Sequence, residues 1–221
     1  MLTILRKKDM RSYYSKRGMV ALLLGCIIVL AAFFPAGHLP PATVPKKILF
    51  VGNSLTYTND LPALVVAAAA KKGIAVETGM LAYPDYALQD HWEDGKLQQM
   101  LASEYFDFVI VQQGPSSQEE GRQMLLEYGK KIKALCDQHQ AKLAFYMVWP
   151  AFSNYEMFDG VIKNYREAAA ATNAILCPVG KAWKTHFDST GDYSYYGPDM
   201  FHPSQKGSEQ AAKVICGSLF E

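Results

Sequence analysis

The chain has 221 residues, of which 50% are hydrophobic and 19% are charged, a composition typical of one folded domain with a short appendage. The formal net charge is +1 and no basic stripe runs along the sequence, so a nucleic-acid partner is not expected. The four cysteines include no C-x-x-C pair, which excludes a recognisable zinc motif and a disulfide framework.

The N-terminus combines positive charge with an apolar run. Six basic residues and one acid lie within the first 17 positions, and Met19–Phe34 carries no charge. A basic head, an apolar run and a Pro-rich stretch are typical of a secretory signal or an uncleaved signal anchor. The excess of positive charge before the apolar run predicts that the N-terminus is cytoplasmic and that the rest of the chain lies on the outer side of the membrane. We expect a basic cytoplasmic segment at 1–17, a signal anchor or signal peptide at 18–37, a Pro-rich linker at 38–45 and an extracytoplasmic domain at 46–221.

Short apolar runs alternate with longer helical patterns after the linker. Almost continuously apolar runs predict strands buried on both faces of a parallel sheet, and their alternation with helices indicates βαβ units in one α/β domain. We predict strands at 47–51, 74–81, 106–111, 142–148 and 174–179. Helices are expected near 61–72, 95–103, 119–138, 155–171 and 204–219.

Polar residues gather just after the predicted strands, where open α/β sheets bind their ligands. Ser54 stands two residues after Gly52, immediately beyond the first strand. A serine on such a strand-to-helix turn exposes its hydroxyl, and its own N–H can point at an oxyanion. A serine after Gly-Asn is also common in ordinary turns, so this position alone is weak evidence for catalysis.

Asp199 and His202 lie three residues apart, just before the last predicted helix. In one loop, the carboxylate can accept a hydrogen bond from the imidazole Nδ1–H, which leaves Nε2 free to take a proton from a serine hydroxyl. Ser54, His202 and Asp199, joined by a five-strand α/β pattern, therefore predict a Ser-His-Asp catalytic triad.

With these motifs, the sequence resembles the SGNH/GDSL family of serine hydrolases over essentially all of residues 46–219. Phe50–Thr56 matches the first family block, with Asn53 where many members carry Asp, and Asp199–His202 matches the last block. The resemblance implies a flavodoxin-like three-layer α/β/α sandwich with a five-stranded parallel sheet. It gives the nucleophile, general base and orienting carboxylate to the serine, histidine and aspartate of the predicted triad, and it implies no cofactor and no metal.

The two middle blocks depart from the family pattern. The second block normally supplies a glycine N–H to the oxyanion hole, whereas Asp85 aligns with that position here. The third normally reads Gly-x-Asn-Asp, whereas this chain has Gln112-Gln113-Gly114, similar to a Gln-Gly variant in carbohydrate acetylesterase branches. The implied oxyanion hole consists of the N–H groups of Ser54 and Asp85 and the side-chain amide of Gln113. Gln112 is the alternative, because adjacent strand residues face opposite ways.

Asn53, Tyr86 and Trp149 are predicted to contact the substrate, and the Tyr-rich loop 193–196 is either a sugar-stacking platform or simple packing. His91 is expected to pack the loop after the second strand.

We predict an extracytoplasmic serine esterase, periplasmic or at the cell surface, or secreted if the apolar segment is cleaved. O-acyl groups on carbohydrate, acetyl above all, are the favoured substrate. The implied partners are a small-molecule or glycan ester and, through the N-terminal helix, a membrane. The oligomeric state is left open. A lipid or lysophospholipid esterase, an O-acyltransferase with the same triad and an inactive glycan-binding module are the alternatives.

Overall fold

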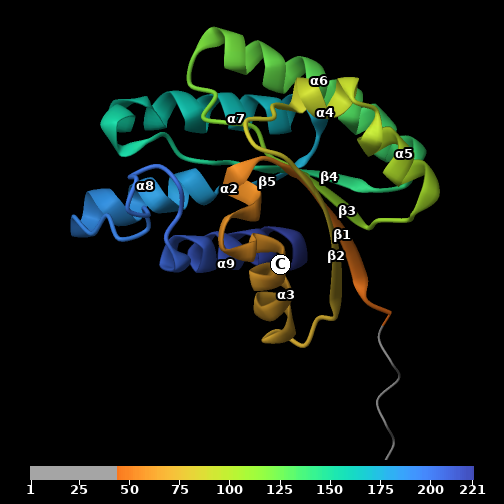
Figure 1. Ribbon diagram of the computed structural model, residues 1–221, viewed down its shortest axis with the longest axis horizontal. Coiled ribbons are helices and arrows are strands. Elements are labelled where there is room, and N and C mark those ends of the chain that lie inside the picture. Colours follow the sequence, from red (N-terminus) through yellow and green to blue (C-terminus); the bar gives the residue numbers. More distant parts are fainter. Residues whose placement is uncertain (1–43) are drawn as a thin grey trace, which may run out of the picture. The chain divides into compact units, whose positions relative to one another are not determined.

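Five parallel strands form the central sheet of the computed structural model, which describes residues 44–221 (Figure 1). The strand order is β2-β1-β3-β4-β5, and every neighbouring pair is parallel. The predicted five-stranded parallel sheet is confirmed, with strand ends shifted by one or two residues. The strands are β1 (Lys46–Gly52), β2 (Val76–Ala82), β3 (Phe108–Val111), β4 (Lys142–Tyr146) and β5 (Ile175–Cys177).

The buried centre of the sheet explains the apolar runs. Ile48–Val51 of β1 and all of β3 are buried, because helices cover both faces of these central strands. β2 lies at an edge, and most of its residues are at least partly exposed. From β1 the chain moves first to β2 and then across to β3, so the direction of winding reverses beside β1. The carboxyl end of β1 is therefore a topological switch point, where doubly wound sheets bind ligands.

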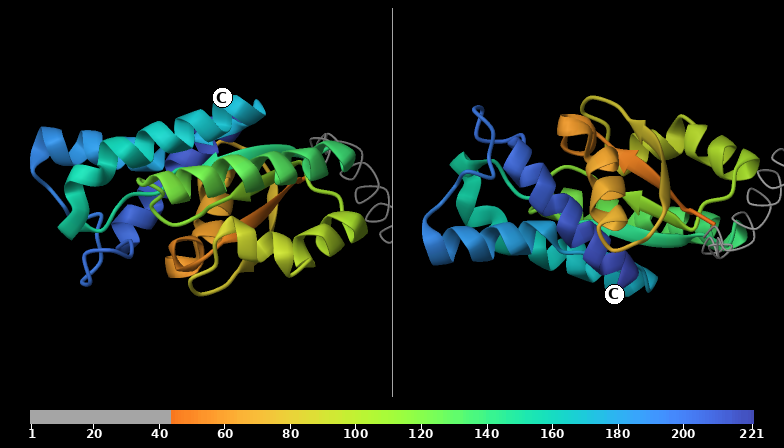
Figure 2. Two further views of the ribbon diagram at one scale, coloured as in Figure 1. Left: turned by 90° about the horizontal axis from the view of Figure 1, so that it is seen from above. Right: turned by 90° about the horizontal axis from the view of Figure 1, so that it is seen from below.

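Helices cover the sheet on both sides (Figures 1 and 2). α3 and α9 pack together on one face, whereas α6 contacts both α4 and α7 on the other. α8 contacts both α7 and α9. The expected α/β/α layering is thus present. The helices are α2 (Ser54–Tyr57), α3 (Leu61–Ala70), α4 (Leu88–Glu93), α5 (Lys96–Ser103), α6 (Glu119–Gln138), α7 (Phe158–Thr172), α8 (Val179–Thr190) and α9 (Gln205–Phe220), with short 3-10 turns η1 (Thr58–Asp60) and η2 (Phe152–Met157).

Three helices, α2, α4 and α8, were not expected from the sequence, and α2 is a single turn of four residues. α4 has only six residues, too few to show a helical period. α8 buries Trp183 and Phe187, which are one turn apart on the same side, but few other apolar residues support the pattern. The hydrophobic stripe of α8 is therefore narrow, and its sequence pattern alone is too weak to predict the helix.

The predicted segments 1–17 and 18–37, and most of the linker, lie outside the described residues. Within residues 44–221, none of the helices is both long enough and apolar enough to cross a membrane. The three cysteines of this part, Cys136, Cys177 and Cys216, are buried free thiols. Burial raises the pKa of Cys136 and of Cys177 to about 12, so both thiols stay protonated and unreactive.

Candidate active site

Ser54 is the first residue of α2, directly after the end of β1. Asn53 shapes this turn, because its Oδ1 accepts a hydrogen bond from Leu55 N (3.1 Å) and its Nδ2 donates to Tyr86 O (3.0 Å). A side chain that caps a helix in this way satisfies an N–H that would otherwise lack a partner. Asn53 also lines the cavity beside Ser54, so its predicted substrate contact stays a prediction, while both ends of its side-chain amide join the serine turn to the loop after β2.

Ser54, His202 and Asp199 form one chain of hydrogen bonds. His202 Nε2 lies 2.9 Å from Ser54 Oγ, and His202 Nδ1 lies 2.6 Å from Asp199 Oδ2. The hydrogen bond from His202, helped by two backbone N–H groups, holds the pKa of Asp199 below its usual range. The ionised carboxylate favours the tautomer with hydrogen on Nδ1, so Nε2 can accept the serine proton. The structure therefore brings together the three residues predicted as the triad.

The loop that carries His202 is held from several sides. Gly197 N donates to His202 O (2.7 Å), and Met200 adopts a left-handed φ of 56° that turns the chain between Asp199 and His202. Asn59 Nδ2, from the segment after the nucleophile, donates to Pro203 O (2.9 Å). These contacts fix the histidine relative to the serine although the two are far apart in sequence.

Trp149 supports this loop from the core. Its side chain is completely buried, stacks on Trp183 with ring centroids 3.5 Å apart, and donates from Nε1 to Phe201 O (2.9 Å). The prediction that Trp149 contacts substrate is wrong, because β4 ends inside the molecule and the indole points into the packed layer.

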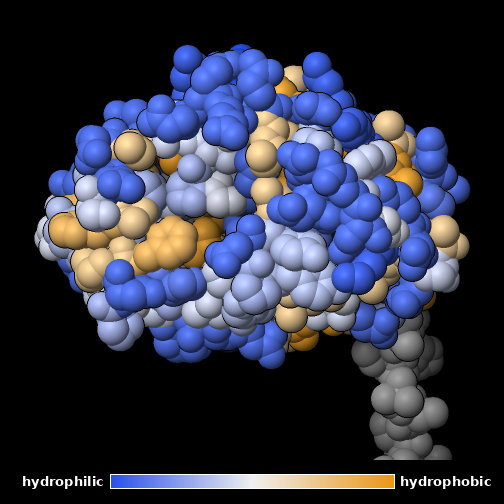
Figure 3. Space-filling view, turned by 45° about the horizontal axis from the view of Figure 1, so that its top comes forward, coloured by the Kyte–Doolittle hydropathy of each residue, from blue (hydrophilic) through white to orange (hydrophobic). Residues whose placement is uncertain are grey.

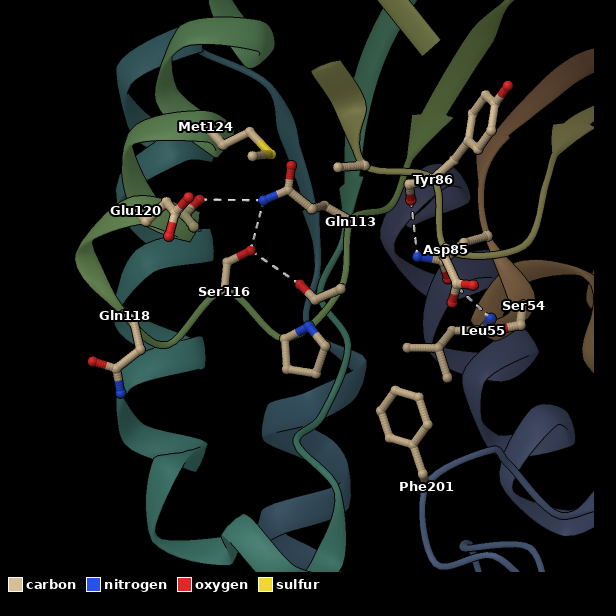
Figure 4. A pocket seen from close by; sticks show the side chains of 15 residues that line it. Ser54, Leu55, Asp85, Tyr86, Gln113, Ser116, Gln118, Glu120, Met124 and Phe201 are labelled. Atoms are coloured by element: carbon tan, nitrogen blue, oxygen red, sulfur yellow. Dashed lines mark hydrogen bonds between the residues drawn. The ribbon is translucent and has the colours of Figure 1, made fainter. Parts of the chain in front are cut away.

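A cavity of about 430 Å³ opens beside Ser54. Figure 4 shows Ser54 and Asp85 on one side of it, Glu120 and Met124 from the start of α6 on the other, and Gln113 between them. Among residues 44–221, two carboxylates and no lysine or arginine line the cavity. Its polar and apolar lining and its place beyond the carboxyl ends of β1 and β3 are typical of a small-molecule site.

The residues predicted to form the oxyanion hole all line this cavity, but they differ in whether their N–H groups are free to donate. The N–H of Ser54 is the first of α2 and has no acceptor within the helix. Asp85 stands in a left-handed turn with φ of 61°, and its exposed side chain lies at the cavity. Figure 4 places Asp85 beside Ser54, in agreement with the bond between Asn53 and Tyr86 that joins their loops.

Gln113 lines the cavity but is not free to donate. Its Nε2 donates to Ser116 Oγ (2.7 Å) and Gly121 O (3.2 Å), and its Oε1 accepts from Leu88 N (3.4 Å). A glutamine amide has two N–H donors, and both are used. The assignment of Gln113 as an oxyanion donor is therefore not supported by this arrangement, in which the side chain ties α4, β3 and α6 together.

Gln112 faces the other way, into the serine turn. Its Oε1 accepts from Asn53 N (2.9 Å) and Thr56 Oγ1 (2.8 Å), and it is only 1% exposed. It does not line the cavity, so it does not replace Gln113 as an oxyanion donor.

The loop after β2 is held by an aromatic cluster. His91 is buried and donates from Nε2 to Gly52 O (2.8 Å), while the rings of Tyr83 and Tyr86 pack around it. Burial lowers the pKa of His91, against the smaller opposing effect of that hydrogen bond. The ring of Tyr86 thus packs on His91, while Tyr86 is also among the residues that line the cavity, so its predicted substrate contact stays a prediction. His91 has the structural role expected of it.

Part of the site was missed by the sequence analysis. Gln118, Glu120 and Met124 supply the wall opposite the nucleophile, and Phe201 lies inside the Asp-x-x-His motif itself. Gln118 and Glu120 lie in the stretch that follows β3, and position after a strand is the sequence signal that could have found them.

Aromatic residues border the histidine loop on the surface. Tyr195 and Tyr196 of the predicted platform are buried, but Tyr193 is exposed and packs against exposed Phe152, with ring centroids 4.9 Å apart. Phe152 N donates to Met200 O (2.9 Å). Figure 3 shows hydrophobic patches of this limited size on an otherwise hydrophilic face. Packing thus explains Tyr195 and Tyr196, and Tyr193 is the tyrosine of this loop whose ring could contact a ligand.

In the part of the chain from residue 44 onward, no three His, Cys, Asp or Glu side chains come close enough to hold a metal ion.

Comparison with known proteins gives matches among solved structures alone, since neither a family model nor a curated protein matches the chain. A protein from Slackia heliotrinireducens described as a candidate SGNH hydrolase is 23% identical, with a TM-score of 0.70 over 80% of this chain and 100% of that one. A lipase/acylhydrolase from Enterococcus faecalis is 19% identical, with a TM-score of 0.63 over 78% and 94%. A catalytic mutant of an acetylxylan esterase from Geobacillus stearothermophilus is 14% identical, with a TM-score of 0.62 over 80% and 96%. At these identities the likeness establishes the fold, and the predicted SGNH fold is confirmed.

Proposed function

We propose that this chain is a serine ester hydrolase that works through an acyl-enzyme on Ser54. The observation that carries the proposal is the hydrogen-bonded order Ser54–His202–Asp199, whose serine lines the cavity. A binding module needs neither an imidazole on a serine hydroxyl nor a carboxylate on that imidazole. The two bonds together form the arrangement that activates a serine nucleophile.

The geometry implies a two-step acyl transfer. Ser54 Oγ attacks the ester carbonyl carbon while its proton passes to His202 Nε2. The resulting oxyanion accepts hydrogen bonds from the N–H groups of Ser54 and Asp85. The bond to the alcohol oxygen then breaks, and His202 protonates the leaving alcohol. Water attacks the acyl-enzyme with His202 as base, and Ser54 leaves with the returned proton as the acid is released.

The favoured substrate is an O-acyl, above all O-acetyl, ester on a carbohydrate. Acetylxylan esterases are among the proteins that share this fold. In the described part of the chain, the cavity is lined by two carboxylates, Asp85 and Glu120, and by no lysine or arginine that would pair with a phosphate. This favours a neutral sugar ester over a lysophospholipid. An O-acyltransferase would use the same residues with a sugar hydroxyl in place of water.

The place of action is proposed from the sequence alone. The basic head followed by the apolar run at 18–37 favours an extracytoplasmic domain with a membrane anchor or, after cleavage, a secreted one.

Hydrolysis of p-nitrophenyl esters of increasing acyl length by the full chain, beside Ser54→Ala, tests the activity. Ser103→Ala is the control, because Ser103 is an exposed serine at the end of α5. We expect turnover by the parent and the control and none by Ser54→Ala, with acetyl preferred over long acyl chains. A preference for long chains would favour the lipid alternative. A folded parent that neither turns over esters nor reacts with a fluorophosphonate would favour the glycan-binding alternative.

A further inference from the structure

Gln112 occupies an unusual place beneath the serine turn. It is nearly fully buried, yet it sits at the end of β3 among apolar strand residues. Its Oε1 accepts two hydrogen bonds at once, from the backbone N–H of Asn53 and from the hydroxyl of Thr56. Asn53 immediately precedes the proposed nucleophile, so this oxygen holds the peptide group between Gly52 and Asn53, one residue before Ser54.

The orientation of the Gln112 amide is fixed by its neighbours. Turning the amide over would place its NH₂ group against the N–H of Asn53, which is a donor only. In the orientation observed, Nε2 is buried without a hydrogen-bond partner in the described part of the protein. A buried donor without a partner costs on the order of 1–3 kcal/mol.

Close packing around Gly52 leaves no room for a side chain at this position. A Cβ on Gly52 would collide with the Thr56 hydroxyl and would lie 2.5 Å from Gln112 Oε1. The glycine thus lets the glutamine reach the turn from the neighbouring strand. Three elements, β1, α2 and β3, meet at this one oxygen.

We propose that Gln112 is a positioning residue for the nucleophile, which acts by fixing the Asn53 peptide and not by donating to the oxyanion. The inference rests on the proposed serine hydrolase function. Asn53 has an extended backbone with φ of −131°, and its N–H bond to Gln112 holds the start of the turn. A turn that relaxes there moves Ser54 relative to His202, and a displacement of about 1 Å costs on the order of 100-fold in rate.

The central variant is Gln112→Met with Thr56→Val, measured against Thr56→Val alone. Methionine keeps roughly the length of glutamine and removes the acceptor, and valine removes the hydroxyl that would otherwise be left unpaired. In the double variant the Asn53 N–H replaces Gln112 Nε2 as the one unpaired donor. The two variants should therefore have similar melting temperatures.

Four quantities are measured on the full chain: the fraction of active sites by fluorophosphonate titration, kcat per active site, KM for p-nitrophenyl acetate and Tm. We expect kcat per active site to fall at least tenfold from Thr56→Val to the double variant. KM should stay within about twofold, because Gln112 does not line the cavity. In Gln112→Glu, burial of this side chain favours the neutral carboxyl, which retains an acceptor oxygen, and kcat should stay within about threefold of the parent.

Other outcomes would overturn the inference. A lower Tm or a smaller active fraction with kcat per site unchanged would make Gln112 a structural residue only. A higher KM with kcat unchanged would make it a substrate contact. If the double variant does not fold, Gln112→Glu decides, since a folded but tenfold slower enzyme would show that the acceptor is not what matters. An unlabelled, inactive parent would instead remove the proposed function itself.

Discussion

Gln113 Nε2 donates to Ser116 Oγ over 2.7 Å, and this bond joins the end of β3 to the loop that leads into α6. Ser116 passes the contact on by donating to Gly114 O (3.0 Å). The glutamine that the family resemblance assigned to the oxyanion hole is therefore part of the cavity wall.

Replacement of Gln113 should have a small effect on catalysis. We expect Gln113→Met to lower kcat by less than about tenfold, because both of its N–H groups already serve protein acceptors. Loss of a true oxyanion donor costs about 100- to 1,000-fold. Ser116→Ala is the matched variant, since it breaks the same bond from the other side, and steady-state kinetics of both should agree. A 100-fold loss in Gln113→Met alone would return Gln113 to the oxyanion hole.

Asp199→Asn should lower kcat by about 1,000- to 10,000-fold with little change in folding. The amide cannot enforce the Nδ1–H tautomer of His202, and catalysis by a triad depends on it. The side chain of Asp199 is about half exposed, so its removal leaves no buried charge behind. Ester hydrolysis and thermal unfolding at pH 7 measure the two effects, and a loss of activity that merely follows a loss of Tm would contradict this prediction.

The fold was predictable because its signals are local and redundant. The apolar runs of β1 and β3 and the length of α6 are set by burial on both faces of a parallel sheet, and they leave a clear pattern in sequence. Ser54 and the Asp199–His202 motif stand next to such elements, so their meeting followed from the topology.

The rest of the site depended on side-chain directions that a pattern does not record. Gln112 and Gln113 differ by one position at a strand end, and only the packing of Asn53 and Ser116 against them decides what each amide binds. Trp149 follows β4 much as Ser54 follows β1. The chain after β4 is buried, however, and Trp149 stacks on Trp183 of α8.

The buried His91 should make stability depend on pH. Its pKa is lowered by burial, so the unfolded chain takes up a proton at a higher pH than the folded protein does. Stability from the neutral imidazole is full above about pH 6.5, the unfolded value, and is lost as pH falls from there through the folded pKa. Urea unfolding at pH 7.5 and 5.5 should show a smaller loss in His91→Gln than in the parent. His139→Gln, at the end of α6, controls for the loss of a histidine elsewhere, and an equal loss in all three proteins would contradict the assignment.

The two carboxylates of the cavity should make the enzyme discriminate against anionic esters. Asp85 and Glu120 line the cavity, and none of the lining residues from position 44 onward is a lysine or arginine. A like charge at about 7 Å in a water-like medium costs roughly 0.6 kcal/mol. We expect p-nitrophenyl acetate to be hydrolysed with a higher kcat/KM than the monoanionic p-nitrophenyl succinate, and Glu120→Gln to reduce that ratio about two- to fivefold. Glu119→Gln is the control, because Glu119 pairs with Arg122 and does not line the cavity. The effect of Glu120→Gln should shrink in high salt, since exposed charges are screened. Equal changes in the ratio for both variants would mean that the cavity does not select its substrate by charge.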